Sequence, residues 1–205
     1  MNSVQQRFSA EDRRQQILDV AKWIFSRKGY EGTTTREIAN AAKVNEAIIF
    51  RHFPTKEELY WAVIDQSCKT SNARGQMVER LRQGGELKEV FHDLALEILN
   101  RRSRDQTLTR LLFFSALENH ELSSRFFDNY VAQFYETLAS YVKEQVLAGK
   151  FRDVDPMVAA RGFLGMVVYH SLVDTLFAGG RLKKHDHEKI ADELSTIWLN
   201  GMLNK

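Results

Sequence analysis

Hydrophobic residues recur with helical spacing along most of this 205-residue chain. In the first segment they fall every three or four positions, at Ile17, Val20, Ala21, Ile24 and Phe25. Such spacing gives a helix one apolar face, which predicts a helix over residues 10–28. Ser9 is a candidate N-cap for this helix and Gly29 a candidate stop. Because no stretch alternates apolar and polar residues as a strand would, the sequence predicts an all-α protein of about nine helices.

Capping signals divide the next segment into two short helices. Thr34 and Glu37 have the spacing of a capping box, which opens the first helix. Asn45 is a good N-cap for the second helix, and Pro54 stops it. Helices this short bury little surface alone, so we expect them to pack on the first helix as a three-helix unit. That arrangement is typical of a helix-turn-helix, whose second helix can enter the major groove of DNA.

The rest of the chain predicts longer helices separated by glycine, proline and polar breaks. They cover residues 55 to about 71, 87–102, 107–119, 122–147, 156–178 and 187–203. The segment 156–178 is apolar on most sides, so we expect it to be buried from two directions. Gly162 and Gly165 would let a neighbouring helix approach it closely.

Composition and charge refine this picture. The chain is 43% hydrophobic and 27% charged, as in soluble globular proteins, and its single cysteine excludes an intramolecular disulfide. Because it has no signal peptide and no run approaching about 18 apolar residues, we expect a cytoplasmic protein without a membrane partner. Residues 1–56 hold ten Lys/Arg against six Asp/Glu, a local charge of +4 in a chain of net charge +2. This basic quarter favours a phosphate-facing surface.

The run GTTTREIANAAKVNEAIIFRHFPTKEELY, from Gly32 to Tyr60, resembles the signature of the TetR family of transcriptional regulators. The upstream Ile17-Leu18, Ala21, Phe25 and Gly29-Tyr30 fit the first helix of that family at the expected distances. The resemblance implies an N-terminal helix-turn-helix DNA-binding domain, residues 1–55. A larger helical ligand-binding and dimerisation domain, residues 56–205, would follow it.

The resemblance also assigns DNA contacts, which suit the residue types. We expect the DNA backbone to be held by Thr34, Thr35, Asn45, His52 and Lys56. Base edges would be read by Glu46, Ala47 and Ile48, with Arg36 and Arg51 as candidates for a base or a phosphate. A glutamate accepts from the cytosine amino group, an isoleucine touches a thymine methyl, and an arginine binds guanine.

Three positions depart from the usual family pattern. Lys43 stands where the family has glycine, which adds a cation beside the DNA and a side chain in a tight turn. Asn45 replaces serine or threonine, a conservative change for a cap. Phe50 replaces tyrosine and lacks the hydroxyl that would bind a phosphate, so we expect Phe50 to pack rather than to contact DNA.

Aromatic residues of the middle helices have two interpretations that stay open. At helical spacing they are typical of a filled core, whereas the resemblance implies a cavity for a small apolar or amphipathic ligand. The candidates for lining such a cavity are Trp61, Phe91, Phe113, Phe114, Phe127, Tyr130, Phe134, Met166, Tyr169 and His170. The family also implies a homodimer formed through the last two helices.

The sequence and the resemblance together favour a repressor that leaves a near-palindromic operator when a small, mostly apolar ligand binds. The alternative is a DNA-binding adaptor whose larger domain binds a protein partner. We expect no enzyme, because no nucleophile–base pair, glycine-rich phosphate loop or metal-binding helix motif occurs. No cofactor and no metal site are expected either, since the run His185-Asp186-His187 reads as a solvated loop.

Overall fold

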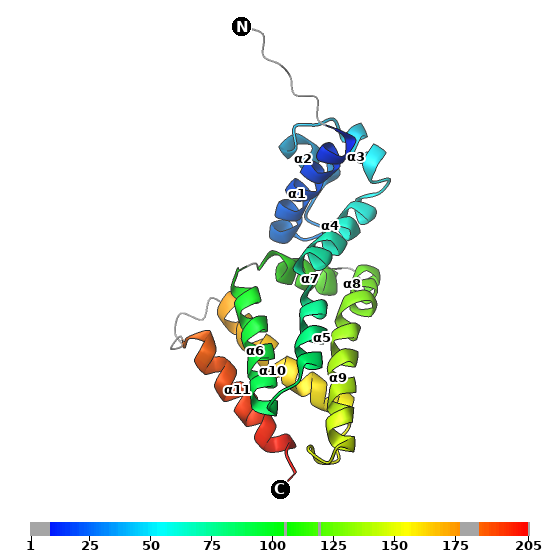
Figure 1. The fold of residues 1–205 in the computed structure, drawn as a ribbon. Coiled ribbons are helices and arrows are strands. Elements are labelled where there is room, and N and C mark those ends of the chain that lie inside the picture. The colour runs from blue at the N-terminus through cyan, green and yellow to red at the C-terminus, as the bar shows by residue number, and fades with distance from the viewer. Residues whose placement is uncertain (1–8, 105, 119, 177–184, 205) are drawn as a thin grey trace. The chain divides into compact units, whose positions relative to one another are not determined.

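A computed structural model describes residues 9–104, 106–118, 120–176 and 185–204, without the side chains of 102–104, 120, 175 and 176. Within these ranges the chain is all-α, as the sequence predicts. The helices are α1 Ala10–Lys28, α2 Thr35–Ala41, α3 Glu46–His52, α4 Lys56–Ser71, α5 Ala73–Gln83, α6 Leu87–Arg104, α7 Thr107–Glu118, α8 His120–Phe126, the π-helical η1 Phe127–Val131, α9 Ala132–Leu147, α10 Pro156–Leu176 and α11 His187–Met202 (Figure 1).

These described elements form nine longer helical runs, in agreement with the number predicted. Only Asn72, which is left-handed with φ 43°, separates α4 from α5. The helices α8, η1 and α9 follow one another without a break, where the sequence predicts one helix over residues 122–147. The predicted starts of α1 and α10 are also confirmed, with Ser9 and Asp155 as their N-caps.

The described chain divides into two compact units, of which the first contains residues 9–71, 107–118 and 120–125. Its core joins α1 to α2, α4 and α7. Phe25 and Tyr60 meet edge to face, with ring centroids 4.8 Å apart, and both are fully buried. The Tyr60 hydroxyl donates to the carbonyl of Leu111, 2.7 Å away. Because α4 and α7 share this core, the first unit extends beyond the predicted domain boundary at residue 55.

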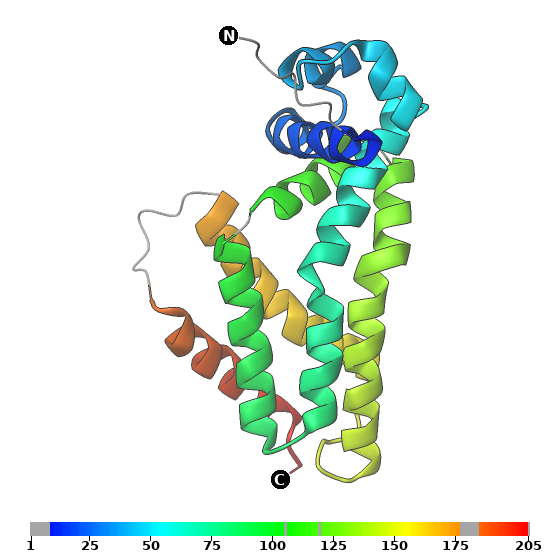
Figure 2. The ribbon, with the colours of Figure 1, turned by 45° about the horizontal axis from the view of Figure 1, so that its top comes forward.

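The second unit contains the described residues 72–104, 106, 126–176 and 185–204. Within it, α10 packs against α6, α9 and α11, and it runs obliquely to α5, α6 and α9 (Figure 2). An aromatic cluster of Phe91, Phe151, Phe163 and Trp198 forms its centre, with Phe91 and Trp198 only 4.4 Å apart between ring centroids. The indole N–H of Trp198 donates to the Ala159 carbonyl at 3.2 Å, so this buried polar group is satisfied.

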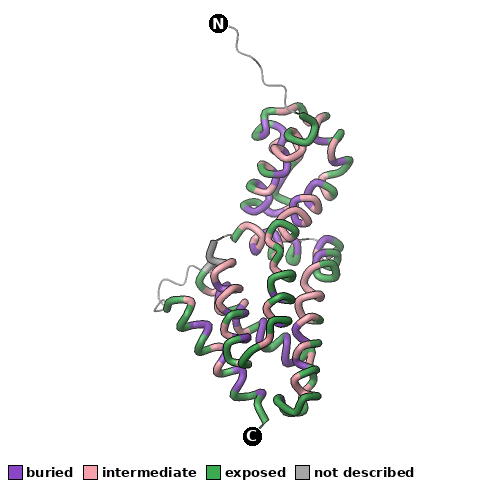
Figure 3. The backbone as a smooth tube through the Cα atoms, viewed as in Figure 1, coloured by how far each residue is buried: buried purple, intermediate pink, exposed green. Residues whose placement is uncertain are grey.

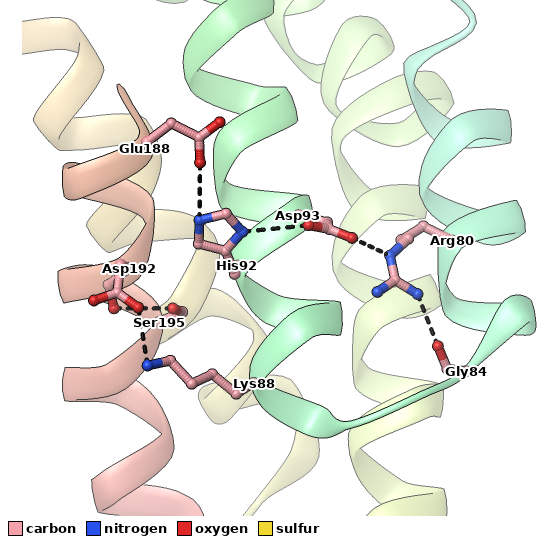
Figure 4. A network of polar contacts seen from close by, with 8 residues as sticks. All are labelled: Arg80, Gly84, Lys88, His92, Asp93, Glu188, Asp192 and Ser195. Atoms are coloured by element: carbon pink, nitrogen blue, oxygen red, sulfur yellow. Dashed lines mark hydrogen bonds and ion pairs between the residues drawn. The ribbon is translucent and has the colours of Figure 1, made fainter. Parts of the chain in front are cut away.

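Exposed and buried positions follow one another along α11, as its amphipathic sequence predicts (Figure 3). Ion pairs connect the polar side of α11 to α6, and a further ion pair connects α6 to α5 (Figure 4). His92 of α6 faces Asp93 at 3.2 Å and Glu188 of α11 at 3.3 Å. Asp93 also accepts from Arg80 of α5 at 2.8 Å. Because at least one partner in each pair is about half exposed or more, each pair adds at most about 1 kcal/mol.

One described helix differs from the expectation about membranes. The segment Pro156–Asp174 of α10 is long and apolar enough to cross a membrane by length and composition, with a mean hydropathy of 1.2. Core helices of soluble proteins pass the same test, and α10 contributes Ala160, Phe163 and Val167 to the buried core. The hydropathy of α10 is therefore weak evidence for a membrane segment.

Candidate nucleic-acid interface

The short helices α2 and α3 begin at side-chain caps that the sequence predicts. The Thr34 hydroxyl accepts from the backbone N–H of Glu37 at 3.2 Å. The Asn45 side chain accepts from the N–H of Ala47 at 2.9 Å. A complete capping box also needs the Glu37 carboxylate to accept from the Thr34 N–H. That bond is absent among the described contacts, and the Glu37 carboxylate pairs with Lys28 instead.

Buried apolar residues fix which face of α2 and α3 points outward. Ile38 and Ala39 of α2 and Ile49 of α3 are buried, and α2 packs on both α1 and α3. The predicted DNA-contacting side chains lie away from that core. Six of them are exposed (Thr34, Arg36, Lys43, Asn45, Ala47 and Arg51) and five are half-buried (Thr35, Glu46, Ile48, His52 and Lys56). None of the eleven is buried, and their individual roles stay predictions.

The backbone of the turn between α2 and α3 shows why the family usually has glycine where this chain has Lys43. This residue has φ 53°, in the left-handed region that favours glycine. The turn is closed by hydrogen bonds from the N–H of Lys43 to Asn40 and of Val44 to Ala39, at 3.1 and 3.0 Å. The position where the family usually has glycine therefore requires a positive φ, and Lys43 adopts it at a conformational cost.

Two contacts involve predicted backbone-binding residues. The Lys56 ammonium lies 4.2 Å from the centre of the Tyr30 ring, a cation–π contact at the start of α4. The Thr35 hydroxyl lies 2.5 Å from a carboxylate oxygen of Glu46, and so joins the first residue of α2 to the first residue of α3. The sequence predicts a backbone contact for Thr35 and a base contact for Glu46, and it gives no sign that the two side chains contact each other.

Phe50 does not pack in the core as expected, because the residue is 44% exposed, whereas its lack of a DNA contact stays a prediction. It lies next to the buried Ile49 on a helix of only seven residues, so its position in α3 turns it away from the core. Phe50 is thus available on the outer surface of α3, although it has no hydroxyl to offer a phosphate.

Helix α7 supplies residues that sequence reasoning did not find. The Glu118 carboxylate accepts from the backbone N–H groups of Tyr30 and Glu31 at 2.7 and 3.1 Å. Arg110 donates through Nε to the carbonyl of Ser26 at 2.6 Å. The Glu118 contacts hold the turn between α1 and α2, and the Arg110 contact holds the end of α1. No local pattern could indicate them, since Glu118 lies 88 residues from Tyr30 in the sequence.

The candidate ligand-binding residues fall in both units. Trp61, Phe113 and Phe114 belong to the first unit, and Phe91, Phe127, Tyr130, Phe134, Met166, Tyr169 and His170 belong to the second. Phe91 is fully buried in the aromatic cluster, which favours packing, whereas Tyr169 is 66% exposed. Trp61 lies under the Arg125 guanidinium, 4.1 Å from its carbon to the ring centre.

The run at residues 185–187 is a helix start. Asp186 caps α11 by accepting from the N–H of Lys189 at 2.7 Å, and His187 contacts the Asn100 side chain at 2.7 Å. Within the described ranges, no three His, Cys, Asp or Glu side chains gather as metal ligands would.

A capped helix-turn-helix with an accessible polar face, in a chain that also holds a larger helical unit, defines the class of DNA-binding transcription regulators. Residues 17–63 match the family described as bacterial regulatory proteins of the tetR family, and residues 89–200 match the AefR-like transcriptional repressor C-terminal domain. The second match alone covers more than half of the chain. This chain belongs to the TetR family of transcriptional regulators, which are not enzymes.

Individual relatives agree with this assignment. The uncharacterised HTH-type transcriptional regulator YvkB of Bacillus subtilis is 26% identical over 191 residues, which cover 91% of this chain and 95% of YvkB. AibR, solved with isovaleryl coenzyme A and operator DNA, has a TM-score of 0.70 at 24% identity and covers 90% of this chain and 97% of its own. FadR of Bacillus subtilis, solved with stearoyl-CoA, has a TM-score of 0.73 at 17% identity, covering 91% and 98%. These two structures show the fold.

Proposed function

We propose that this regulator is a repressor, which binds a near-palindromic operator as a homodimer and releases it when a small, mostly apolar ligand binds. The match of residues 89–200 to a repressor C-terminal domain carries this proposal. In the division of labour that we propose, residues 1–55 read DNA and residues 56–205 bind the ligand and the second subunit. A DNA-binding regulator of this kind acts in the cytoplasm.

The DNA contacts follow from the exposed face of α2 and α3. Lys56, with its stem at the start of α4 and its ammonium over Tyr30, supplies a positive charge for a phosphate. Thr34, Asn45, His52 and Lys43 lie on the same unit and would hold the backbone. Glu46, Ala47 and Ile48 occupy the first turn of α3 and, with Arg36 or Arg51, would read base edges.

Selection from a random duplex library tests this assignment. The wild-type protein should enrich a near-palindromic sequence. Lys56→Ala should then weaken binding by a similar factor on every sequence and lower the slope of log affinity against log salt by about 1. Ile48→Ala should change which base is preferred at one position. If both substitutions weaken all sequences equally, the division between backbone and base contacts is wrong.

The dimer that we propose uses the outward face of α10. Val158, Gly162, Gly165 and Tyr169 are exposed and recur at helical spacing along it. A Cβ added at Gly165 would meet no atom within 4 Å, so the face is open and a partner helix can approach closely. On α11, Ile197 is 58% exposed. An isologous contact between two copies would cover this apolar surface.

Substitution of matched valines tests the dimer. Val158 of α10 is 69% exposed and Val78 of α5 is 41% exposed. Val158→Asp should shift the protein towards monomers in sedimentation velocity and reduce operator affinity more than tenfold, because two half-sites are then bound independently. Val78→Asp should leave both measurements near the wild-type values. Dimers that persist in Val158→Asp would contradict the proposed interface.

The ligand class is suggested by the acyl-CoA molecules in the AibR and FadR structures. We therefore propose an acyl chain or a comparably apolar group as the part recognised. Release requires that the ligand bind more tightly to the DNA-free geometry than to the DNA-bound one. Stearoyl-CoA and isovaleryl-CoA can be titrated into the protein with and without the selected operator. Linkage predicts equal reciprocal shifts in the two affinities, whereas unchanged affinities with both compounds would disprove acyl-CoA control.

A further inference from the structure

The hydrogen bond between Thr35 and Glu46 joins two residues that belong to the two arms of the helix-turn-helix. Thr35 is the first residue of α2 and Glu46 the first residue of α3. The hydroxyl oxygen lies 2.5 Å from the carboxylate Oε1, the distance of a charge-assisted hydrogen bond. Both side chains are half-buried and lie outside the core.

We infer that Thr35 and Glu46 act as one unit in base recognition, in which Thr35 orients the Glu46 carboxylate towards an exocyclic amino group of a base. This inference rests on the proposed function, in which the first turn of α3 reads base edges. Thr35 is then a specificity-positioning residue rather than a phosphate contact of its own.

The chemistry of the hydroxyl supports this role. A threonine hydroxyl has one proton, and Glu46 accepts it, so the Thr35 side chain cannot donate to a phosphate at the same time. Because threonine is β-branched, few side-chain rotamers are available to it within a helix. Few positions are therefore open to the donor oxygen, and it holds one of the two carboxylate oxygens.

The second oxygen, Oε2, determines which base is accepted. A carboxylate is an acceptor only, and in the major groove the cytosine N4 amino group is its matching donor. On a sequence without an amino group at that place, the carboxylate loses its partner and faces phosphates of the same charge. Glu46 therefore acts mainly by rejecting other sequences, and Thr35 keeps the carboxylate from turning away.

The test compares Thr35→Val with Thr35→Ser on DNA selected by the wild-type protein. Valine keeps the shape of threonine but has no hydroxyl, whereas serine keeps the donor. Affinities are measured on the selected duplex and on duplexes altered one base pair at a time. For the wild type we expect one position, a C·G pair, at which Glu46→Gln removes a discrimination of about tenfold.

At that same position, Thr35→Val should reduce the discrimination at least threefold while its thermal midpoint stays close to that of the wild type. Thr35→Ser should restore the discrimination. Thr34→Val is the matched control, because Thr34 caps α2 without contacting Glu46. It should weaken binding without changing the base preference.

Two results would overturn the pairing, and one would overturn the proposed function instead. If Thr35→Val weakens binding equally on all duplexes, Thr35 is a backbone contact. If it leaves the discrimination unchanged, the hydrogen bond does not position Glu46. A wild-type protein that enriches no sequence from the library would contradict sequence-specific DNA binding itself, and so the two failures are distinguishable.

Discussion

The outer face of α2 and α3 and the aromatic cluster of the second unit are organised in opposite ways. Around α2 and α3, six of the eleven predicted DNA-contacting residues are exposed, and the Thr35–Glu46 hydrogen bond joins two of the others. In the cluster, Phe91, Phe151, Phe163 and Trp198 come from distant parts of the chain and contact one another. Apart from a bonded pair such as Thr35 and Glu46, a surface of the first kind can change one residue at a time, whereas a core of the second kind responds as a whole.

The largest effect that we expect comes from the cluster. Phe91→Ala removes a ring that contacts Phe151, Phe163 and Trp198, and should lower the free energy of unfolding by about 3–5 kcal/mol. Urea denaturation followed by circular dichroism measures this loss. Phe127→Ala, at a ring that is 48% exposed, is the control and should cost far less. Similar losses in both variants would erase the contrast between core and surface aromatics.

A smaller effect is expected at the Glu118 contact in the first unit. Glu118→Ala removes the acceptor of the Tyr30 and Glu31 N–H groups and should cost about 1–3 kcal/mol. Glu118→Gln keeps a carbonyl acceptor and should lose less. Because the contact holds the turn before α2, operator affinity should fall in the same order, as measured by fluorescence anisotropy. Equal affinity in all three proteins would mean that the turn does not need this anchor.

Alkaline pH should destabilise the first unit, through two groups of α4, by about 1 kcal/mol or more. Burial raises the pKa of the Cys68 thiol to about 12, and desolvation also raises the pKa of the Tyr60 hydroxyl above its ordinary value. Groups whose pKa is raised by folding stabilise the protein fully below their unfolded pKa values, here below about pH 9. This stability is lost as the pH rises towards about 12. The urea concentration at the midpoint of unfolding should therefore decrease as the pH rises above about 9. It should decrease less steeply in the double variant Cys68→Ser, Tyr60→Phe.

The smallest effect has the opposite sign. Lys43→Gly should raise the free energy of unfolding by about 0.5–1 kcal/mol, because relief of a left-handed residue outweighs the added entropy of the unfolded chain. The same change removes a cation from the proposed DNA face, so the salt slope of binding should fall by about 1. Lys43→Ala separates the two effects, since it should lose the charge without the gain in stability. A destabilised Lys43→Gly would show that the turn depends on the lysine side chain.

Local signals predicted much of the fold, because caps and apolar periodicity act over a few residues. Ser9, Asn45 and Asp155 cap the helices that the sequence places after them. The π-helical turn at Phe127–Val131 was not predicted, since its residues fit an α-helix equally well. The sequence predicted which side chains of α2 and α3 point outward. It could not predict the Thr35–Glu46 bond, because that bond depends on how the two helices meet. The exposure of Phe50 likewise follows from packing and not from residue type.

The anchor of Glu118 on the turn after α1 has a consequence for exchanging parts between regulators. A chimaera that joins residues 1–55 of this chain to the body of another repressor would leave the amides of Tyr30 and Glu31 without their carboxylate. It would also remove the Arg110 side chain, which donates to the Ser26 carbonyl in α1. The transplantable module is therefore discontinuous in the gene, and a working graft carries α7 together with the N-terminal helices.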